Sequence, residues 1–117
     1  MDTKKKTPVI IDFDPGLDDA VCFMMMLGSE QYDVIGACPV SGNKGLNITE
    51  PNALKLCELC ARADIPVLRG AKKGIFKEER TSGNVHGDNG FGPHVNLPEP
   101  TKRWSSSTRG TSCMSRL

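Results

Sequence analysis

The chain has 117 residues, of which 38% are hydrophobic and 25% charged, so its length and composition suit one globular domain of modest size. Its net charge of +1 gives no electrostatic reason to bind nucleic acid or an anionic membrane. No apolar run is long enough to span a bilayer, and residues 9–11, which follow the N-terminal lysines, are too short a run for a signal peptide. We therefore expect a cytoplasmic protein whose partners include neither nucleic acid nor a membrane.

The first predicted elements are a strand, a helix and a second strand. Residues 9–13 form a short, β-branched apolar run, which predicts a strand buried on both faces. A turn at residues 15–16 ends it, and a helix with acidic residues in its first turn follows over residues 18–28. We expect the methionines of this helix, residues 24–26, to pack in the core. Residues 32–40 predict the second strand.

A second helix and a third strand complete the predicted core. The helix is expected over residues 50–62, with Thr49 as its N-cap and Pro51 in its first turn. Residues 66–69 predict a short third strand. A strand, helix, strand, helix, strand order predicts an α/β fold with a Rossmann-like parallel sheet and right-handed crossovers.

Polar residues follow the predicted strands where ligands bind in such sheets, just beyond the carboxyl ends. Asp12 and Asp14 end the first strand, Asn43 follows the second, and the third leads into a glycine-rich stretch that contains His86. Residues 70–100 show no helix or strand period, as is typical of functional or disordered loops. We expect these side chains to share one site.

The five cysteines are an odd number without the spacing of a disulfide framework. Cys57 and Cys60 form a CxxC pair, but no second CxxC or histidine pair accompanies it, so zinc or redox chemistry is not indicated. We expect both to act as small apolar residues of the second helix.

Four carboxylates lie within eight residues, at 12, 14, 18 and 19. Such crowding costs Coulomb energy unless a cation lies between the carboxylates, and oxygen-rich turns of this kind suit calcium. The plainer interpretation, acidic residues at a helix N-terminus, accounts for Asp18 and Asp19 but not for Asp12 and Asp14.

Two other carboxylate patterns were compared with this one. An EF-hand loop needs glutamate at its last ligand position, where this chain has Phe23. A haloacid-dehalogenase-like phosphotransferase also has two aspartates one residue apart after its first strand, but Pro15 stands where that pattern has glycine. The phosphotransferase stays as an alternative.

The chain resembles the inosine–uridine-preferring nucleoside hydrolases. Matching segments occur in the family's order over most of the chain: residues 12–20 (DFDPGLDDA), 40–43 (VSGN), 52–54 (NAL), 64–67 (DIPV), 86–92 (HGDNGFG) and 97–100 (LPEP). The resemblance implies that the fold is nucleoside-hydrolase-like and that residues 1–102 are the N-terminal part of such a domain. It also implies hydrolysis of the N-glycosidic bond of a ribonucleoside by a calcium-activated water.

The resemblance also implies roles for individual residues. Asp14 would be a calcium ligand and the general base, and Asp19 and Asp12 would complete the chain's share of the metal site. Asp18 would hydrogen-bond a ribose hydroxyl, Asn43 would help to hold the ribose or a metal-bound water, and His86 would lie on the side of the base. A nucleoside is therefore the expected partner, and a homo-oligomer is compatible with the sequence.

Residues 103–117 depart from the family, and we expect a disordered tail there. Read in a shifted frame, permitted codons for residues 103–114 can spell VEQQHAGDFM, close to the family's usual continuation, so we interpret the tail as a frameshift product. Members of the family are much longer, and their later half supplies further ligands and the proton for the leaving base. We therefore expect little turnover from this chain, and a non-catalytic fragment that associates through an exposed sheet edge is the other alternative.

Overall fold

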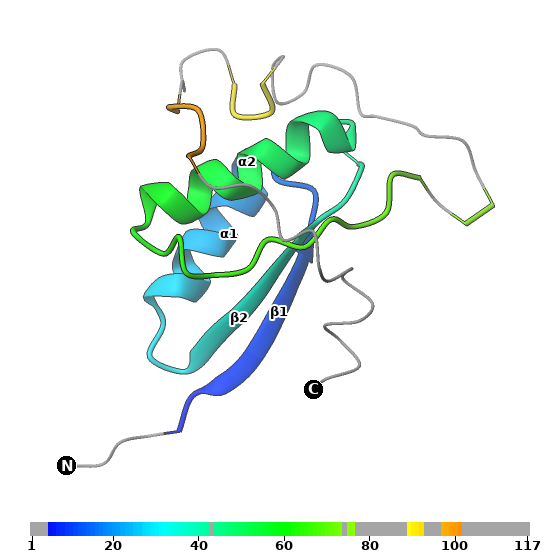
Figure 1. The fold of residues 1–117 in the computed structure, drawn as a ribbon. Coiled ribbons are helices and arrows are strands. Elements are labelled where there is room, and N and C mark those ends of the chain that lie inside the picture. Colours follow the sequence, from blue (N-terminus) through cyan, green and yellow to red (C-terminus); the bar gives the residue numbers. More distant parts are fainter. Residues whose placement is uncertain (1–4, 43, 74, 77–88, 93–96, 102–117) are drawn as a thin grey trace.

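The structure is a computed structural model that describes residues 5–42, 44–73, 75–76, 89–92 and 97–101. Its elements are β1 (Thr7–Phe13), α1 (Leu17–Gly28), β2 (Tyr32–Pro39) and α2 (Leu46–Leu59). In Figure 1 the two strands lie side by side, and both helices lie together on one side of them. The α/β fold with a parallel sheet that the sequence predicts is confirmed.

β1 and β2 pair in parallel from Thr7 opposite Tyr32 to Phe13 opposite Pro39, with a register shift between Val9 and Ile10. β1 is only half-buried through residues 9–11, so the expectation of a strand buried on both faces was wrong. Among the described residues β1 pairs with β2 alone, and the edge position leaves it partly exposed.

The third predicted strand is reduced to a single parallel bridge between Ala37 and Val67. Pro66 O accepts a hydrogen bond from Ala37 N (3.0 Å), and Leu68 N donates to Ala37 O (2.8 Å). The segment therefore has the position and direction of a third strand next to β2. Hydrogen bonds from Gly70 N to Pro39 O (3.0 Å) and from Ser41 N to Ala71 O (3.0 Å) continue the pairing. The ladder is interrupted because Pro39 and Pro66 have no N–H to donate.

α2 begins one turn earlier than the sequence predicts. Its N-cap is Gly45, so Thr49 is not the cap and Pro51 lies inside the helix rather than in its first turn. The prediction relied on the preference of threonine for N-cap positions, but Leu46 supplies a buried apolar residue one turn before it. α1 begins at Leu17, one residue before the predicted start.

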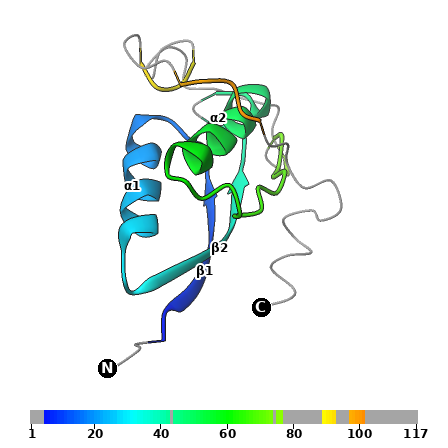
Figure 2. The same cartoon turned by 60° about the vertical axis from the view of Figure 1, so that its left-hand side comes forward.

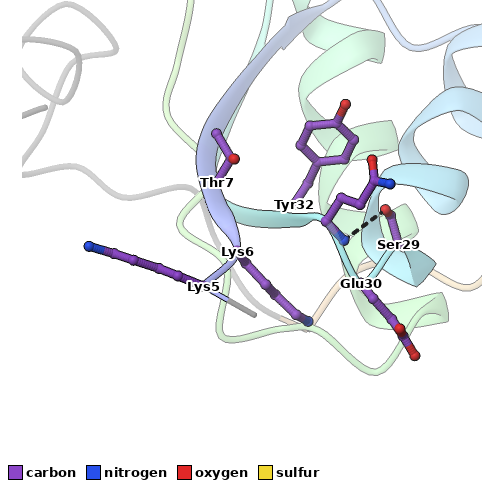
Figure 3. Close-up of a pocket in the computed structure, with 7 residues that line it drawn as sticks. Lys5, Lys6, Thr7, Ser29, Glu30 and Tyr32 are labelled. Carbon is purple, nitrogen blue, oxygen red and sulfur yellow. Dashed lines mark hydrogen bonds between the residues drawn. The ribbon is translucent and has the colours of Figure 1, made fainter. Parts of the chain in front are cut away.

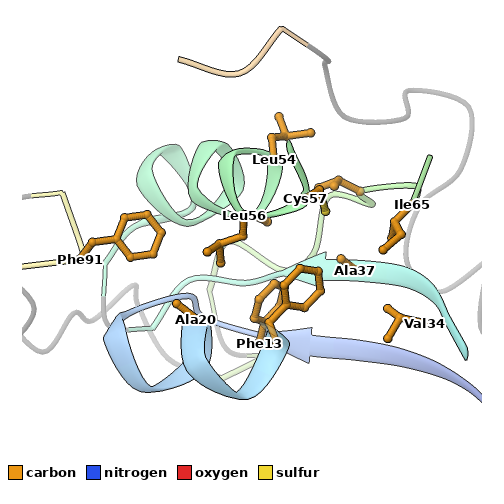
Figure 4. Packing of buried hydrophobic residues seen from close by; sticks show 12 residues of the cluster. Phe13, Ala20, Val34, Ala37, Leu54, Leu56, Cys57, Ile65 and Phe91 are labelled. Carbon is orange, nitrogen blue, oxygen red and sulfur yellow. The ribbon is translucent and has the colours of Figure 1, made fainter. Parts of the chain in front are cut away.

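One hydrophobic cluster joins the helices to the strands (Figure 4). Phe13 of β1 stacks on Phe23 of α1, with ring centroids 5.2 Å apart, and Leu56 of α2 and Phe91 are also in the cluster. Cys57 is buried here as expected, while Cys60 is half-buried. The stacked rings fix the carboxyl end of β1 against α1.

The methionine prediction was wrong for two residues of the three. Met26 packs against the cluster, but Met24 is 38% exposed and Met25 is 70% exposed. Successive helical residues point about 100° apart, so three in a row cannot all face one core.

The described residues between 70 and 100 contain no helix or strand, as the sequence predicts. The last described segment returns to α2, where the N–H and the hydroxyl of Thr101 both donate to Glu58 Oε1 (2.7 Å each) and Lys55 pairs with Glu99 (3.5 Å). Figure 2, turned from Figure 1, shows this segment above α2. Among the described residues, no helix combines the length and the apolar character that crossing a membrane requires.

Candidate functional site

The site is built where β1 turns into α1. Phe13 is the last residue of β1 and is 7% exposed, so its ring is directed into the core. Side chains alternate along a strand, so Asp12 and Asp14, the residues on either side of Phe13, are directed away from that core. Residues 14–19, called here the aspartate turn, then lead into the first turn of α1, where Ala20 N donates to Gly16 O (3.0 Å).

Asp14 and Asp19 lie together at the two ends of the aspartate turn. Asp14 N donates to Asp19 Oδ2 (3.1 Å). Burial, a hydrogen bond with the Asp14 side chain and the charges of Asp14 and Asp18 together raise the pKa of Asp19 to about 6, against the opposing effect of the hydrogen bond from Asp14 N. Carboxylates placed so close together are an arrangement in which an added cation would be favourable.

The segment after β2 closes over Asp14. Val40 N donates to Phe13 O (2.9 Å), which continues the sheet pairing past the end of β2. The backbone of Gly42 then packs so tightly on the Asp14 carboxylate that a Cβ at residue 42 would overlap Asp14 Oδ2. Glycine at this position lets the main chain approach the carboxylate closely.

The other predicted site residues are exposed or lie outside the described part of the chain. Asp12 is exposed on β1, and Asp18 is exposed in the first turn of α1. Asn43 and His86 lie outside the described residues. Within the described part of the chain, no three His, Cys, Asp or Glu side chains are grouped closely enough to hold a metal ion. The structure thus brings Asp14 and Asp19 together without grouping Asp12 with them.

The donor set fits calcium in part. Calcium binds six to eight oxygen atoms, mostly from carboxylates, carbonyls and water. Asp14 and Asp19 offer two neighbouring carboxylates, joined by the hydrogen bond from Asp14 N to Asp19 Oδ2. The remaining ligands would come from water and from other groups.

Asn52 of α2 is a residue of the site whose role sequence reasoning missed. It is 2% exposed, and its Nδ2 donates to Asn89 O (2.8 Å) and to Pro15 O (3.3 Å). The signal was present in the sequence, because an amide stands next to Ala53 and Leu54 on the buried side of the helix. A buried polar side chain must find partners, and here they are two loops of the site.

A separate surface pocket lies at the opposite, amino-terminal end of the strands (Figure 3). Lys5 and Lys6 before β1 and Glu30 and Tyr32 after α1 line it, and Gln31 N donates to Ser29 Oγ (3.1 Å) beside them. The lysine side chains extend outward in Figure 3. None of the predicted site residues lines this pocket.

Comparison of the sequence with known proteins gives one consistent result. A sequence profile described as inosine-uridine preferring nucleoside hydrolase matches residues 9–115. The chain is 38% identical over 95 residues to an uncharacterized protein of Schizosaccharomyces pombe, covering 81% of this chain and 30% of that protein. It is 41% identical over 95 residues to the pyrimidine-specific ribonucleoside hydrolase RihA of Escherichia coli K12, covering 80% of this chain and 30% of that one.

Solved structures show the same similarity. A plant nucleoside hydrolase superposes with a TM-score of 0.83 at 34% identity, over 96% of this chain and 35% of that chain. A purine-preferring ribonucleoside hydrolase from Gardnerella vaginalis superposes with a TM-score of 0.84 at 26% identity, over 92% of this chain and 35% of that chain. This chain thus spans about a third of the length of the relatives that it matches.

The profile match covers most of the chain, and the segments that carry it include the aspartate turn. The resemblance seen in the sequence is therefore confirmed, and the haloacid-dehalogenase-like alternative is set aside. The chain belongs to the inosine–uridine preferring nucleoside hydrolase family.

Proposed function

We propose that the chain carries part of the active site of a calcium-dependent nucleoside N-ribohydrolase. The activity would be hydrolysis of the N-glycosidic bond of a ribonucleoside to free base and ribose. The observation that carries the proposal is the Asp14–Asp19 pair at the end of β1, with the Gly42 backbone packed against Asp14. Family membership supports the reaction class.

Each predicted site residue has a role in this proposal. Asp14 and Asp19 would bind Ca²⁺, and Asp12 would support them from the end of β1. Asp18, exposed in the first turn of α1, would accept a hydrogen bond from a ribose hydroxyl. Asn43 would also hold the ribose, and His86 would lie on the side of the base.

The chemistry assigned to the chain's own residues is proton transfer and charge stabilisation. When bound, Ca²⁺ would lower the pKa of the attacking water. The Asp14 carboxylate would accept a proton from that water as the oxygen of the water bonds to the anomeric carbon. The bond between this carbon and the base nitrogen would break, and its electron pair would leave with the base, which must then gain a proton. The carboxylates of Asp14 and Asp18 would stabilise the positive charge on the sugar in the transition state.

We propose that turnover by this chain alone is low. It spans about a third of the length of its relatives, and two carboxylates are a small share of the ligands that calcium needs. A site with few ligands binds metal weakly, and a leaving base without a proton donor departs slowly. The relatives differ in their named preference, pyrimidine in one case and purine in another, so the proposal names no base.

Calcium titration by calorimetry tests the proposal. The full chain should bind Ca²⁺, and Asp14→Asn should abolish the binding because it removes a carboxylate of the pair. Asp33→Asn is the matched control, because it removes the same charge from an exposed position in β2, paired in register with Pro8 near the other end of the sheet. The release of free base from inosine and from uridine is then measured with and without Ca²⁺.

Loss of Ca²⁺ binding in both variants would contradict the assignment of Asp14. No binding by the unmodified chain would mean that the described carboxylates are insufficient, and the proposal for this chain would fail. Magnesium-dependent hydrolysis of a phosphate ester, without release of base from nucleosides, would favour the phosphotransferase chemistry instead.

We further propose a homo-oligomer, supported by the exposed apolar side chains on α1. Val21 and Met25 are 53% and 70% exposed, and a mostly apolar surface pocket lies between them and Tyr32. The net charge of +1 gives little repulsion between copies. A cytoplasmic location stays a prediction from the sequence, as does the boundary after residue 102, which lies outside the described residues.

A further inference from the structure

Asn52 joins two segments that are far apart in the sequence. Its Nδ2 donates to Pro15 O (3.3 Å), which lies inside the aspartate turn between Asp14 and Asp19. The same nitrogen donates to Asn89 O (2.8 Å), in the described part of the glycine-rich stretch, residues 89–92. An amide nitrogen carries two N–H groups, so one side chain can serve both carbonyls.

The surroundings of Asn52 leave little freedom for this arrangement to shift. Gly90 has φ of +86°, and a Cβ added there would lie 2.8 Å from Asn52 Nδ2 and 3.3 Å from Pro15 O. Asn89 Oδ1 accepts a hydrogen bond from Phe91 N (2.9 Å), and the Phe91 ring is 3% exposed in the core. Residues 89–92 are therefore fixed to the core by Phe91 and to the aspartate turn by Asn52.

We propose that Asn52 is a positioning residue that holds the aspartate turn and residues 89–92 as one unit. It acts through the backbone carbonyl that follows Asp14, and it touches neither Asp14 nor Asp19 through the bonds described here. Its effect on metal binding rests on the proposed function. The joining of the two segments does not, because it is a property of the metal-free chain.

The position of residue 52 requires a side chain that can donate two hydrogen bonds, one to each carbonyl. Serine or threonine offers one donor and could satisfy one carbonyl only. Aspartate has the shape of asparagine but would direct its oxygens at two carbonyl oxygens. Leucine has the same branching and number of side-chain heavy atoms as asparagine but no donor, so Asn52→Leu removes the hydrogen bonds to Pro15 O and Asn89 O.

Amide hydrogen exchange on the metal-free full chain tests the proposal. Two reporter amides are suitable, because each is bonded within its own segment: Asp14 N to Asp19 Oδ2, and Phe91 N to Asn89 Oδ1. In Asn52→Leu we expect both to exchange at least about tenfold faster. The amide of Leu68, bonded to Ala37 O beside β2, should keep its rate. The control Asn47→Leu makes the same chemical change at an exposed position of α2 and should leave all three rates unchanged.

Faster exchange at only one reporter, or an equal increase at Leu68, would overturn the proposal, because the first shows independent segments and the second a general loss of stability. If Asn52→Leu does not fold, the unmodified chain decides the matter in low concentrations of denaturant. The Asp14 and Phe91 amides should then open with the same dependence on denaturant, and different dependences would overturn the proposal.

Calcium titration of the same variants separates this inference from the proposed function. Residues that orient metal ligands typically change affinity by 10- to 100-fold, so Asn52→Leu should weaken calcium binding by at least about tenfold while Asn47→Leu should not. Unchanged calcium affinity together with faster exchange would overturn the effect of Asn52 on the metal site. If the unmodified chain binds no calcium, the proposed function fails, and the exchange rates alone decide whether Asn52 joins the two segments.

Discussion

The hydroxyl of Thr49 is buried in α2 and makes no hydrogen bond among the described residues. Thr49→Val replaces this hydroxyl with a methyl group of nearly the same shape and removes the cost of burying an unpaired polar atom. We expect the free energy of unfolding to rise by about 1 kcal/mol. Urea denaturation followed by circular dichroism measures this change.

Thr49→Val also distinguishes the observed helix, which begins at Leu46, from the predicted helix, which begins at residue 50. If Thr49 were the N-cap, as the sequence predicts, Thr49→Val would remove a capping bond and cost about 1 kcal/mol. A loss of stability would therefore contradict the helix that begins at Leu46. Thr7→Val is the control, because it makes the same change at an exposed threonine at the start of β1.

Asp19 makes the metal-free fold sensitive to pH. Burial, then the bond and charge of Asp14, raise its pKa from 3.8 to about 6. Between these values the folded chain holds a proton that the unfolded chain has lost, so the free energy of unfolding falls as the pH rises. Without metal, Asp19→Asn should therefore be more stable than the unmodified chain at pH 7, by about 1 kcal/mol once solvent screening is taken into account.

Urea denaturation with a chelator at several pH values measures this difference. The advantage of Asp19→Asn should vanish well below pH 3.8, where Asp19 is protonated in both states. Excess Ca²⁺ should reverse the order at pH 7, because a ligand that binds only the folded chain stabilises it and the amide is a poorer ligand. An advantage of the same size at every pH would show that charge is not its cause.

An ion pair links α2 to the segment that follows the bridge at Val67. Arg69 Nε donates to Glu50 Oε2 (2.7 Å) and Nη2 to Oε1 (3.2 Å), and the Glu50 side chain is only 10% exposed. Arg69→Ala leaves a nearly buried carboxylate without this partner. We expect a loss of about 1–2 kcal/mol in the free energy of unfolding, since the half-exposed arginine itself is screened by water.

Arg62→Ala is the matched control for Arg69→Ala. Arg62 bonds to Asp64 with the same two kinds of contact, 3.0 Å and 3.3 Å, but the Asp64 side chain is 67% exposed. An exposed pair of this kind contributes about 0.5 kcal/mol or less. Equal losses in the two variants, measured by urea denaturation, would contradict the importance of the buried carboxylate.

The order of elements could be predicted from the sequence because periodicity and turn residues are local signals. The strand and helix at Thr7–Phe13 and Leu17–Gly28 follow the β-branched run and the Pro15-Gly16 turn almost to the residue. The start of α2 was misplaced because threonine is favoured at N-caps but also occurs inside helices, and only packing decides between the two. The exposure of Met25 likewise depends on which side of α1 meets the core, which requires the assembled fold.

The candidate site could be predicted in part. The sequence singles out Asp14 and Asp19 because carboxylates crowded into a short turn have few explanations, and the structure brings the two together, while their role stays a prediction. Asn52 belongs to a segment that matches the family, but its role was not predicted, because its two partners are the backbone carbonyls of Pro15 and Asn89, far away in the chain. A carbonyl exists at every residue, so the sequence does not show which of them a buried amide will meet.

The exposed apolar face of α1, formed by Val21 and Met25, predicts association between copies of the chain. Met25→Lys places a charge in the middle of this face, next to Val21 and Tyr32. The average mass in solution should rise with concentration for the unmodified chain and stay near that of a monomer for Met25→Lys. Sedimentation velocity over a wide range of concentrations measures this.

Leu59→Lys is the control for this experiment. Leu59 is 57% exposed at the end of α2, outside the face formed by Val21 and Met25, so the substitution adds the same charge elsewhere. It should associate as the unmodified chain does. Association that both lysine variants weaken equally would point to net charge rather than to α1.

The burial of Phe91 in the same hydrophobic cluster as Phe13 and Phe23 has a consequence for how the chain folds during synthesis. The first strand and helix leave the ribosome early, but a ring from near the other end of the described chain fills part of their core. Closing so long a loop carries an entropic cost, and contacts between distant residues slow folding. Part of the apolar surface of β1 and α1 therefore stays exposed until the glycine-rich stretch has been synthesised. Apolar surface that is exposed during this interval makes a nascent chain prone to aggregation.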